Sequence, residues 1–406
     1  MVSTMKVAGI IAEYNPFHLG HAHQIRLLKE AGFDYVVVCM SGDFVQRGAP
    51  AIVDKYARTR MALSCGADLV LELPSLFAVS SAEYFATAGV RLLASLGCVD
   101  TLCFGYEGDF GPEIKSLLAA LADYLNKEPV SYQTALQAFL RDGFSYPAAR
   151  AKALSQVFPE AASFLQYSNN ILALEYTRAI RRFAPGLELF PIPRTDDGYH
   201  GMRSAEAIRT LLFSGEPVEA YLPAEAFAAL SEAIDTQGLT ASNDFSAMLS
   251  YKLLLEEDFS GYADCSEDLS RKLIKVRSRA CTFSGLVSLL KTKDLTYTRI
   301  SRVLLNIMLN RRQETLSAFS GEGKKNALYA KMLGFRRDAS TLLSAVKKSA
   351  EIPYLSKNAD AAALLHSDAM RLFSLDICAS KIYHLVCSEK TGTLFPNDYE
   401  HPLEIL

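Results

Sequence analysis

The stretch Gly9-Ile10-Ile11-Ala12-Glu13-Tyr14-Asn15-Pro16-Phe17-His18-Leu19-Gly20-His21 decides the fold of this chain. Residues 7–13 form a short apolar run, which predicts a buried strand. Asn15 and Pro16 then favour a turn. Helical spacing begins at or close to His18 and stops at Gly32, a typical residue after a helix C-terminus. A strand, a loop and a helix in this order indicate the first unit of a parallel α/β sheet.

The same alternation continues outward from this stretch. Apolar, partly β-branched runs predict further strands at 34–40, 68–73, 99–104 and 187–193, and helical spacing predicts helices at 54–66, 80–97 and 204–213. Residues 110–183 have a mostly helical pattern. We therefore expect an α/β, Rossmann-like domain with a parallel sheet. In such sheets ligands bind beyond the carboxyl ends of the strands.

Helical patterns dominate after about Pro223, and a soft boundary falls between residues 214 and 241. We predict an α/β domain over 1–225 and a mainly α-helical region over 226–406. From Cys265 to Ala350 there are 18 Lys and Arg against 6 Asp and Glu, a net charge of +12 in a chain whose total is −3. Such a basic block suggests a polyanion-binding face, although solvated helix faces would give the same count.

The composition is that of an ordinary globular protein, with 406 residues, 50% apolar and 21% charged. We expect no membrane span and no secretory signal, because the chain lacks both a run of 18 apolar residues and an N-terminal apolar segment. None of the eight cysteines forms a C-x-x-C pair or a zinc-like cluster. These features favour a reducing, cytoplasmic setting. The oligomeric state stays open.

His18 and His21 are three positions apart, so their imidazoles share one face of the predicted helix at its N-terminus. Unpaired N–H groups there attract anions, and Gly20 lets a phosphate approach the backbone. Two imidazoles can donate hydrogen bonds to phosphoryl oxygens as charge builds in a transition state. A metal site and a purely structural role are the alternatives. No nearby carboxylate or thiol completes a metal-ligand set, so we predict nucleotide binding and no protein-held metal.

These residues resemble a known family. His18-Leu19-Gly20-His21 resembles the HxGH signature of the nucleotidyltransferase superfamily. More narrowly, the residues from Glu13 to His18 resemble the tRNA(Met) cytidine acetate ligase family. Further matches are Met40-Ser41-Gly42-Asp43-Phe44-Val45-Gln46-Arg47-Gly48, Lys55-Tyr56-Ala57-Arg58-Thr59, Asp68-Leu69-Val70-Leu71-Glu72-Leu73-Pro74, Ser168-Asn169-Asn170-Ile171-Leu172 and Tyr199-His200. The resemblance covers about the first 220 residues well and the basic segment more loosely. It implies that residues 1–225 form a nucleotidyltransferase-like, ATP-binding catalytic domain and that residues 226–406 form a mainly helical tRNA-binding region.

The resemblance implies which residues contact ATP, with His18 and His21 catalytic. Either Asn169 or Asn170 also suits a helix N-cap. Ser204 and Arg209 come from a partial match to a second phosphate-binding motif, in which Glu206 is unfavourable near triphosphate unless it points away. The ATP-contact set is Gly9, Ile10, Ile11, Ala12, Glu13, Tyr14, Asn15, Pro16, Phe17, His18, Leu19, Gly20, His21, Ala22, Gly105, Asn169, Asn170, Arg194, Ser204 and Arg209.

Other residues are candidates for contact with substrate or RNA. Gln46, Arg47, Lys55 and Arg58 follow the second strand, near the same crevice, although Lys55 or Arg58 can equally pair with Asp54 or Glu72. In the basic block, Tyr297 can stack on an exposed base, and Arg299 and Arg302 can contact phosphates.

The resemblance implies an ATP-dependent ligase. Acetate would attack ATP to give acetyl-AMP, and N4 of the wobble cytidine of elongator tRNA(Met) would then take the acetyl group to form N4-acetylcytidine. Mg²⁺ is expected with the triphosphate. Two alternatives remain: an adenylyltransferase that acts on a cofactor phosphate, and a tRNA-binding protein without catalysis.

Overall fold

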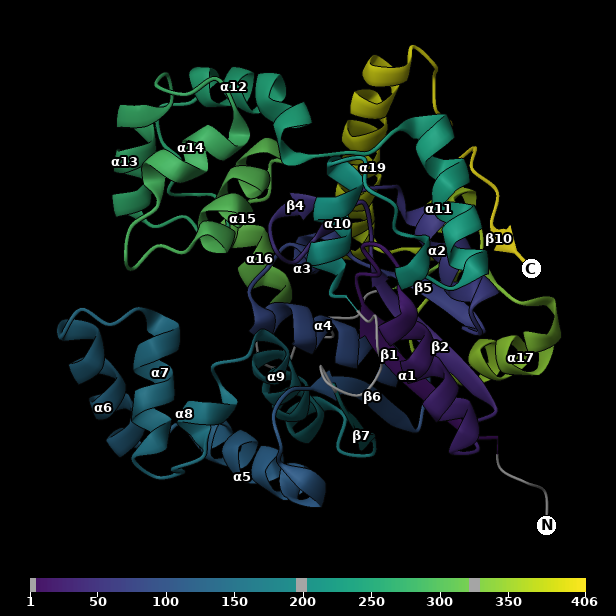
Figure 1. Cartoon of the computed structure of the whole chain (residues 1–406), viewed down its shortest axis with the longest axis horizontal. Helices are drawn as coiled ribbons and strands as arrows, with labels where there is room; N and C mark the ends of the chain where they lie inside the picture. Colours follow the sequence, from purple (N-terminus) through teal and green to yellow (C-terminus); the bar gives the residue numbers. More distant parts are fainter. Residues whose placement is uncertain (1–4, 195–202, 321–328) are drawn as a thin grey trace.

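The computed structural model describes residues 5–194, 203–320 and 329–406. Its centre is a mostly parallel sheet with helices on both faces (Figure 1). Five parallel strands lie in the spatial order β5 (Leu69–Leu73), β2 (Tyr35–Ser41), β1 (Val7–Ala12), β6 (Thr101–Tyr106) and β7 (Glu188–Pro193). These are the five strands that the sequence predicts, with ends shifted by a few residues. The strand order reverses between β1 and β6, so the ligand crevice of such a sheet lies beside β1.

Alternate residues of the strands build two apolar cores. Val7 and Ile11 of β1 join the core formed with α4 (Ala82–Ala94) and α9 (Ser168–Phe183). Ala8 and Ile10 face the other way, into a core shared with α1 (Leu19–Glu30) and α2 (Lys55–Ser64). Because both faces of the strands are buried, their sequences are almost continuously apolar. The loops at the strand ends are left to carry the polar chemistry.

The chain between β6 and β7 is helical, as predicted. Before α9 it forms four helices, α5 (Ile114–Lys127), α6 (Val130–Arg141), α7 (Tyr146–Ser155) and α8 (Ala161–Phe164). α5 packs on α9, and α6 packs on α7. Figure 1 shows α6 and α7 at the outer end of this insertion, away from the sheet.

The second half of the chain is mainly helical. A third apolar core, with Phe245, Leu273, Leu286 and Leu304, holds a group of four helices together, and this helical group comprises α12 (Ser246–Leu255), α13 (Glu267–Val276), α14 (Phe283–Leu290) and α15 (Tyr297–Met308). The other long helices are α10 (Ala205–Phe213), α11 (Ala224–Gln237), α16 (Gln313–Ser320), α17 (Ser340–Ser349) and α19 (Ser367–Thr391). Figure 1 shows the helical group beside the sheet.

The sheet itself crosses the predicted boundary at 225/226. β8 (Ala330–Phe335) pairs antiparallel with β5, and β9 (Tyr354–Leu355) and β10 (Glu404–Ile405) pair parallel with β8. The sequence analysis missed these three strands. β8 is short and contains a lysine and a glycine, so its pattern cannot be told from a helical segment. The division at 225/226 therefore stays a prediction about function, and it is not a boundary of the sheet.

Two further observations concern the whole chain. All eight cysteines are free thiols, four of them buried. Within the described ranges, no helix combines the length and the apolar character that a membrane span requires.

Candidate nucleotide site

The two histidines lie together at the N-terminus of α1. His18 is the N-cap residue, and its Nδ1 accepts a hydrogen bond from the backbone N–H of Gly20 at 3.0 Å. The Nδ1 of His21 accepts from the backbone N–H of His18 at 3.2 Å, which closes a reciprocal capping box. The rings stack with centroids 3.8 Å apart. The prediction that both imidazoles share one helix face is confirmed.

This geometry fixes the protonation of both rings. A nitrogen that accepts a hydrogen bond carries no proton, so the proton of each neutral ring is on Nε2. Burial, together with the nearby charges of Arg194 and Arg209, lowers the pKa of His18 to about 3. Burial also lowers the pKa of His21 well below its usual value, with smaller contributions from His18 and Arg194. Both histidines are therefore neutral donors at pH 7, and neither Nε2 makes a hydrogen bond with any residue that the structure describes.

The aromatic residues of the loop hold His21 in place. The ring of Tyr14 lies 4.7 Å from that of His21, and the ring of Phe17 lies 5.4 Å from it. Tyr14 and Phe17 are both fully buried. Gly9, Ile10 and Ile11, also predicted ATP contacts, lie in β1 and pair with β2. These residues position the loop and the two imidazoles that it carries.

Arg209 connects the second predicted motif to this loop. Its Nη1 donates a hydrogen bond to the backbone oxygen of Asn15 at 2.7 Å. Ser204 is the N-cap of α10, and its hydroxyl accepts from the N–H of Ala207. Glu206 lies 3.3 Å from the guanidinium of Arg47, so its carboxylate is paired with a cation. The structure thus brings the N-terminus of α10 to the histidine loop and explains how Glu206 is tolerated there.

A second wall forms beyond the end of β6. The side chain of Asn169 donates to Oε1 of Glu107 at 2.8 Å, and Nε of Arg194 lies 3.7 Å from the same oxygen. A Cβ at Gly105 would come within 3.1 Å of Cγ of Arg194, so glycine leaves room for the arginine to cross the strand end. Asn169, Arg194 and Gly105, each predicted from the sequence, therefore meet around one carboxylate.

Glu107 is the residue that the sequence analysis missed. A carboxylate directly after a strand, two positions beyond Gly105, is the signal that would have indicated it. Asn170 also binds this segment. It accepts from the N–H of Glu107 and donates to the oxygens of Glu107 and Phe164. Because Asn170 is fully buried and its amide is satisfied, we assign it a structural role. The expectation that one asparagine caps the helix is wrong, since the N-cap of α9 is Tyr167.

Lys55 and Arg58 are buried, which corrects their assignment to substrate or RNA. The Nζ of Lys55 lies 2.6 Å from Asp398 and 3.1 Å from Glu72. Burial alone would lower the pKa of Lys55, but the carboxylates of Asp398, Glu72 and Asp43 raise it well above its usual value. Lys331 pairs with the same two carboxylates, Glu72 and Asp398. Lys55 therefore belongs to a buried ionic cluster.

Arg58 connects the chain at the end of β1 with the chain at the end of β2. Its guanidinium donates to the backbone oxygens of Glu13, Ser41 and Gly42. These oxygens come from the loops after β1 and β2, so the arginine fixes one loop against the other. Gln46 also links these two parts of the chain, because its backbone N–H donates a hydrogen bond to Oε1 of Glu13 at 2.8 Å.

The predicted RNA contacts of α15 lie next to the loop that carries Arg47. β3 (Phe44–Val45) and β4 (Ala49–Pro50) form a hairpin, and the Gly48 turn of that hairpin packs on α15 at Ser301 and Arg302. Tyr297 is 44% exposed. Arg299 and Arg302 both lie within 3.4 Å of Asp264, which offsets part of their charge. The segment Tyr199-His200 lies outside the described residues.

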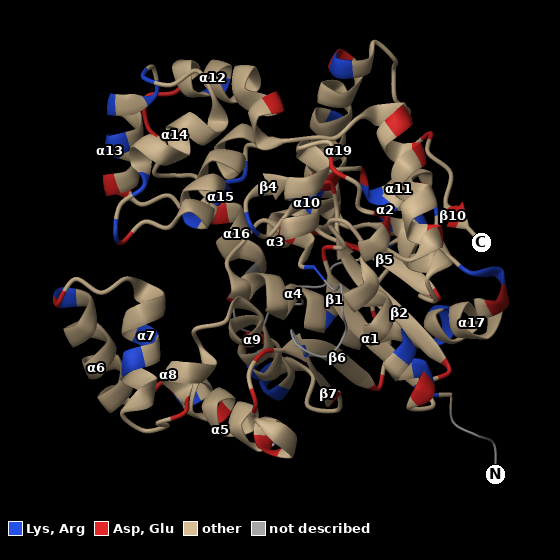
Figure 2. Cartoon of the chain, viewed as in Figure 1, with Lys and Arg blue, Asp and Glu red and all other residues tan. Residues whose placement is uncertain are grey.

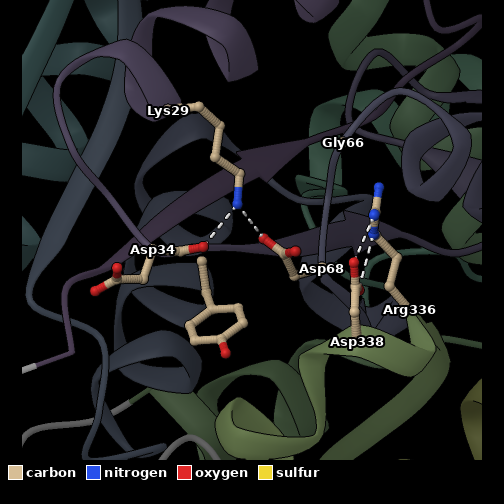
Figure 3. A pocket seen from close by; sticks show the side chains of 7 residues that line it. Lys29, Asp34, Gly66, Asp68, Arg336 and Asp338 are labelled. Atoms are coloured by element: carbon tan, nitrogen blue, oxygen red, sulfur yellow. Dashed lines mark hydrogen bonds and ion pairs between the residues drawn. The ribbon is translucent and has the colours of Figure 1, made fainter.

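One cavity lies at the opposite edge of the sheet (Figure 3). It has a volume of about 360 Å³ and is lined by Lys29, Asp34, Asp68, Arg336 and other residues at the amino ends of β2 and β5. Lys29 pairs with Asp68 at 2.7 Å, and Arg336 pairs with Asp338 at the same distance. Its cations are engaged internally, so the histidine loop is the better candidate for a nucleotide site. Among the described residues, no group of three His, Cys, Asp or Glu side chains could hold a metal ion.

Comparisons with known proteins agree with this geometry. The HIGH Nucleotidyl Transferase family model matches residues 5–395. The chain is 36% identical to a tRNA(Met) cytidine acetate ligase of Thermoanaerobacter sp. (strain X514), over 98% of this chain and 99% of that protein. It is also 36% identical to the ligase of that name from Acetivibrio thermocellus, over 93% and 94% of the two chains.

Two solved structures have the same fold. Apo TmcAL from Thermotoga maritima superposes with a TM-score of 0.91 at 28% identity, covering 99% of this chain and 100% of that one. TmcAL of the same organism bound with alpha-thio ATP superposes with a TM-score of 0.90 at 28% identity, covering 98% and 100%.

Proposed function

Because this chain belongs to the tRNA(Met) cytidine acetate ligase family, within the HIGH nucleotidyltransferases, we propose that it acetylates N4 of the wobble cytidine of elongator tRNA(Met). The reaction consumes ATP and acetate and passes through acetyl-AMP. The observation that carries the proposal is the pair of neutral imidazoles at the N-terminus of α1, each with Nδ1 engaged by the backbone and Nε2 left as a donor.

In the first step a carboxylate oxygen of acetate forms a bond to the α-phosphorus of ATP, and the bond from that phosphorus to pyrophosphate breaks. His18 and His21 donate Nε2–H to phosphoryl oxygens as charge builds on them. Their positions are fixed before the reaction, so the donors need no reorganisation in the transition state. Neutral rings also avoid the cost of burying two like charges 3.8 Å apart.

Arg194 and Arg209 are close enough to His18 for their charges to lower its pKa, and Asn169 shares the Glu107 carboxylate with Arg194. The planar guanidinium of Arg194 can donate two hydrogen bonds to a phosphate. The guanidinium of Arg209 is held at the histidine loop by its hydrogen bond to the backbone oxygen of Asn15. The carboxylate of Glu107 contacts the side chains of Asn169 and Arg194 and orients both. Mg²⁺ arrives with ATP as part of the substrate, and the described residues supply no ligand set for it. No step is assigned to the metal.

In the second step N4 of cytidine forms a bond to the acetyl carbon, AMP leaves, and N4 loses one proton. The target base lies in a single-stranded loop, so it can enter the site without breaking a duplex. Arg47 is exposed in the hairpin that packs on α15, and Tyr297 is exposed at the start of α15. We assign them to the RNA, while Arg299 and Arg302 contribute charge that Asp264 reduces.

Exchange of labelled pyrophosphate into ATP tests the first step, and mass spectrometry of tRNA(Met) for N4-acetylcytidine tests the second. We expect exchange that requires acetate and labelled acetate in the tRNA. Exchange with a cofactor phosphate in place of acetate would show a small-molecule adenylyltransferase. RNA binding without exchange for any acid would show a non-catalytic tRNA-binding protein.

A further inference from the structure

A cavity of about 540 Å³ lies between α13 and α14, outside the nucleotide site. Lys272, Lys275 and Arg279 line one side of it, and its remaining lining is Val276, Leu289, Leu290 and Thr292. No acidic residue lines this groove. Figure 2 shows the basic residues along α13, with acidic residues at one end of the helix. We call this feature the α13–α14 groove.

The cations of the groove have few internal partners, although the carboxylate of Asp268, one turn before Lys272, offsets part of the charge of Lys272. Lys272 and Lys275 are three positions apart on α13, Arg279 follows in the turn after the helix, and all three line the groove. Among the described residues none of the three is in an ion pair, whereas their basic neighbours are engaged. Arg271 pairs with Asp268 and Glu267, and Arg277 donates to two backbone oxygens at the end of α12. The charge of the groove is therefore available to an external anion.

The other side of the groove is apolar and accessible. Leu289 is 49% exposed, and Val276 is partly exposed beside it. A row of cations beside an apolar wall suits a polynucleotide, since phosphates meet the cations and sugar or base faces meet the wall.

The groove is connected to the nucleotide site by direct packing. α13 contacts α14, α14 contacts α15, and α15 contacts the hairpin that carries Arg47. RNA bound in the groove can therefore lie along the helical group toward the histidine loop. We propose that the α13–α14 groove binds backbone phosphates of the tRNA substrate, at a position separate from the site that receives the target base. This inference rests on the proposed function for the identity of the RNA.

The test is the triple variant Lys272→Ala, Lys275→Ala, Arg279→Ala in the full chain. The matched control is Lys115→Ala, Lys127→Ala, Arg141→Ala, which removes the same charge from exposed residues outside the basic block that have no ion pair among the described residues. Binding of tRNA(Met) is measured against KCl concentration, and acetate-dependent ATP–pyrophosphate exchange is measured without tRNA. We expect the groove variant to bind tRNA at least about tenfold more weakly at 0.1 M salt, with the salt slope reduced by about 2 to 3.

Exchange should stay within about twofold of wild type in both triple variants, because acetyl-AMP formation uses no RNA. Leu289→Ser should weaken tRNA binding and leave the salt slope unchanged, because it removes apolar contact only. Unchanged tRNA affinity in the groove variant, with exchange intact, would overturn the groove and leave the proposed function standing. If the control triple variant loses as much tRNA affinity as the groove variant, the loss comes from net charge, and the proposal about the groove is also overturned. Wild-type protein that lacks exchange but binds tRNA through the groove would overturn the ligase alone.

Discussion

The Nδ1 atoms of His18 and His21 both point into the backbone of their own helix, where each accepts one N–H. The same two hydrogen bonds that cap α1 therefore set the tautomer of both rings. Helix capping and donor placement are one structural feature in this site, and substitutions can separate them.

His18→Asn should keep the cap and remove the donor, because the Asn side chain reaches the Nδ1 position but not the Nε2 position. We expect acetate-dependent exchange to fall by about 100-fold, as for the loss of one transition-state donor. The melting temperature should change little, since Asn is among the best N-cap residues. His18→Gln is the matched variant. Its amide extends to the Nε2 position, and it should retain more activity than Asn. Equal activity of the Asn variant and wild type would contradict a donor role.

Acid should destabilise the protein through His18. The folded pKa is about 3 and the usual value is 6.5, so between these pH values only the unfolded state binds the proton. Stability is unaffected above about pH 6.5 and falls as pH decreases through this window, by up to about 1.4 kcal/mol per pH unit. Urea unfolding at pH 7, 6, 5 and 4 measures the slope. His18→Asn should have a smaller slope than wild type, and His366→Asn, at an exposed position, is the control. A wild-type slope in His18→Asn would show that the buried ring does not cause the loss.

Lys55→Met should unfold the protein more easily without a specific effect on RNA. It leaves Asp398 and Glu72 with one cation fewer in a fully buried cluster. Removal of one partner from a buried pair costs about 3 to 5 kcal/mol. Lys29→Met removes a partly exposed pair with Asp68 and should cost about 1 kcal/mol or less. Urea denaturation compares the two. If Lys55→Met weakens tRNA binding while its unfolding free energy is unchanged, the direct RNA role is correct after all.

Gly48→Ala should move the hairpin away from α15. The residue has φ of +80°, and an added Cβ would lie 2.5 Å from the backbone nitrogen of Arg302. Gly32 has φ of +84° with nothing within 4 Å of its Cβ position, so Gly32→Ala carries the same backbone strain without the collision. We expect Gly32→Ala to cost about 1 to 2 kcal/mol and Gly48→Ala to cost more.

The Gly48 substitution should also affect the two half-reactions differently. Acetylation of tRNA(Met) should fall more than acetate-dependent exchange, because the hairpin contacts α15, the helix that we propose faces the RNA, and also contacts the loop after β1. Single-turnover assays of each step measure the difference. An equal loss in both steps would indicate that the contact serves only stability.

The sequence predicted the parts of the site that are local. A strand, a turn and a capped helix are encoded within fifteen residues, so the positions of His18 and His21 followed from spacing alone. Arg194 and Arg209 were named from resemblance, and in the structure the charges of both lower the pKa of His18. The five parallel strands were predicted because residues buried on both faces are continuously apolar.

Features that depend on distant partners were not predictable in the same way. Lys55 is buried because Asp398 approaches it from 343 positions along the chain, and nothing near Lys55 indicates that partner. β8 is a strand because β5 offers it an edge, while its own pattern is ambiguous. The hydrogen bonds between the Asn170 side chain and the Glu107 backbone form only when α9 packs beside the end of β6, so the sequence near either residue does not indicate them.

The place of β8 in the sheet has a consequence for synthesis of the protein. β5 is complete within the first 73 residues, but its outer edge stays unpaired until residues 330–335 arrive. A ribosome therefore finishes most of the polypeptide while the nascent nucleotide-binding half still exposes a strand edge, which is prone to pair with other chains. Truncation after residue 225 should yield an aggregating fragment, because β8 is then missing and the outer edge of β5 stays unpaired.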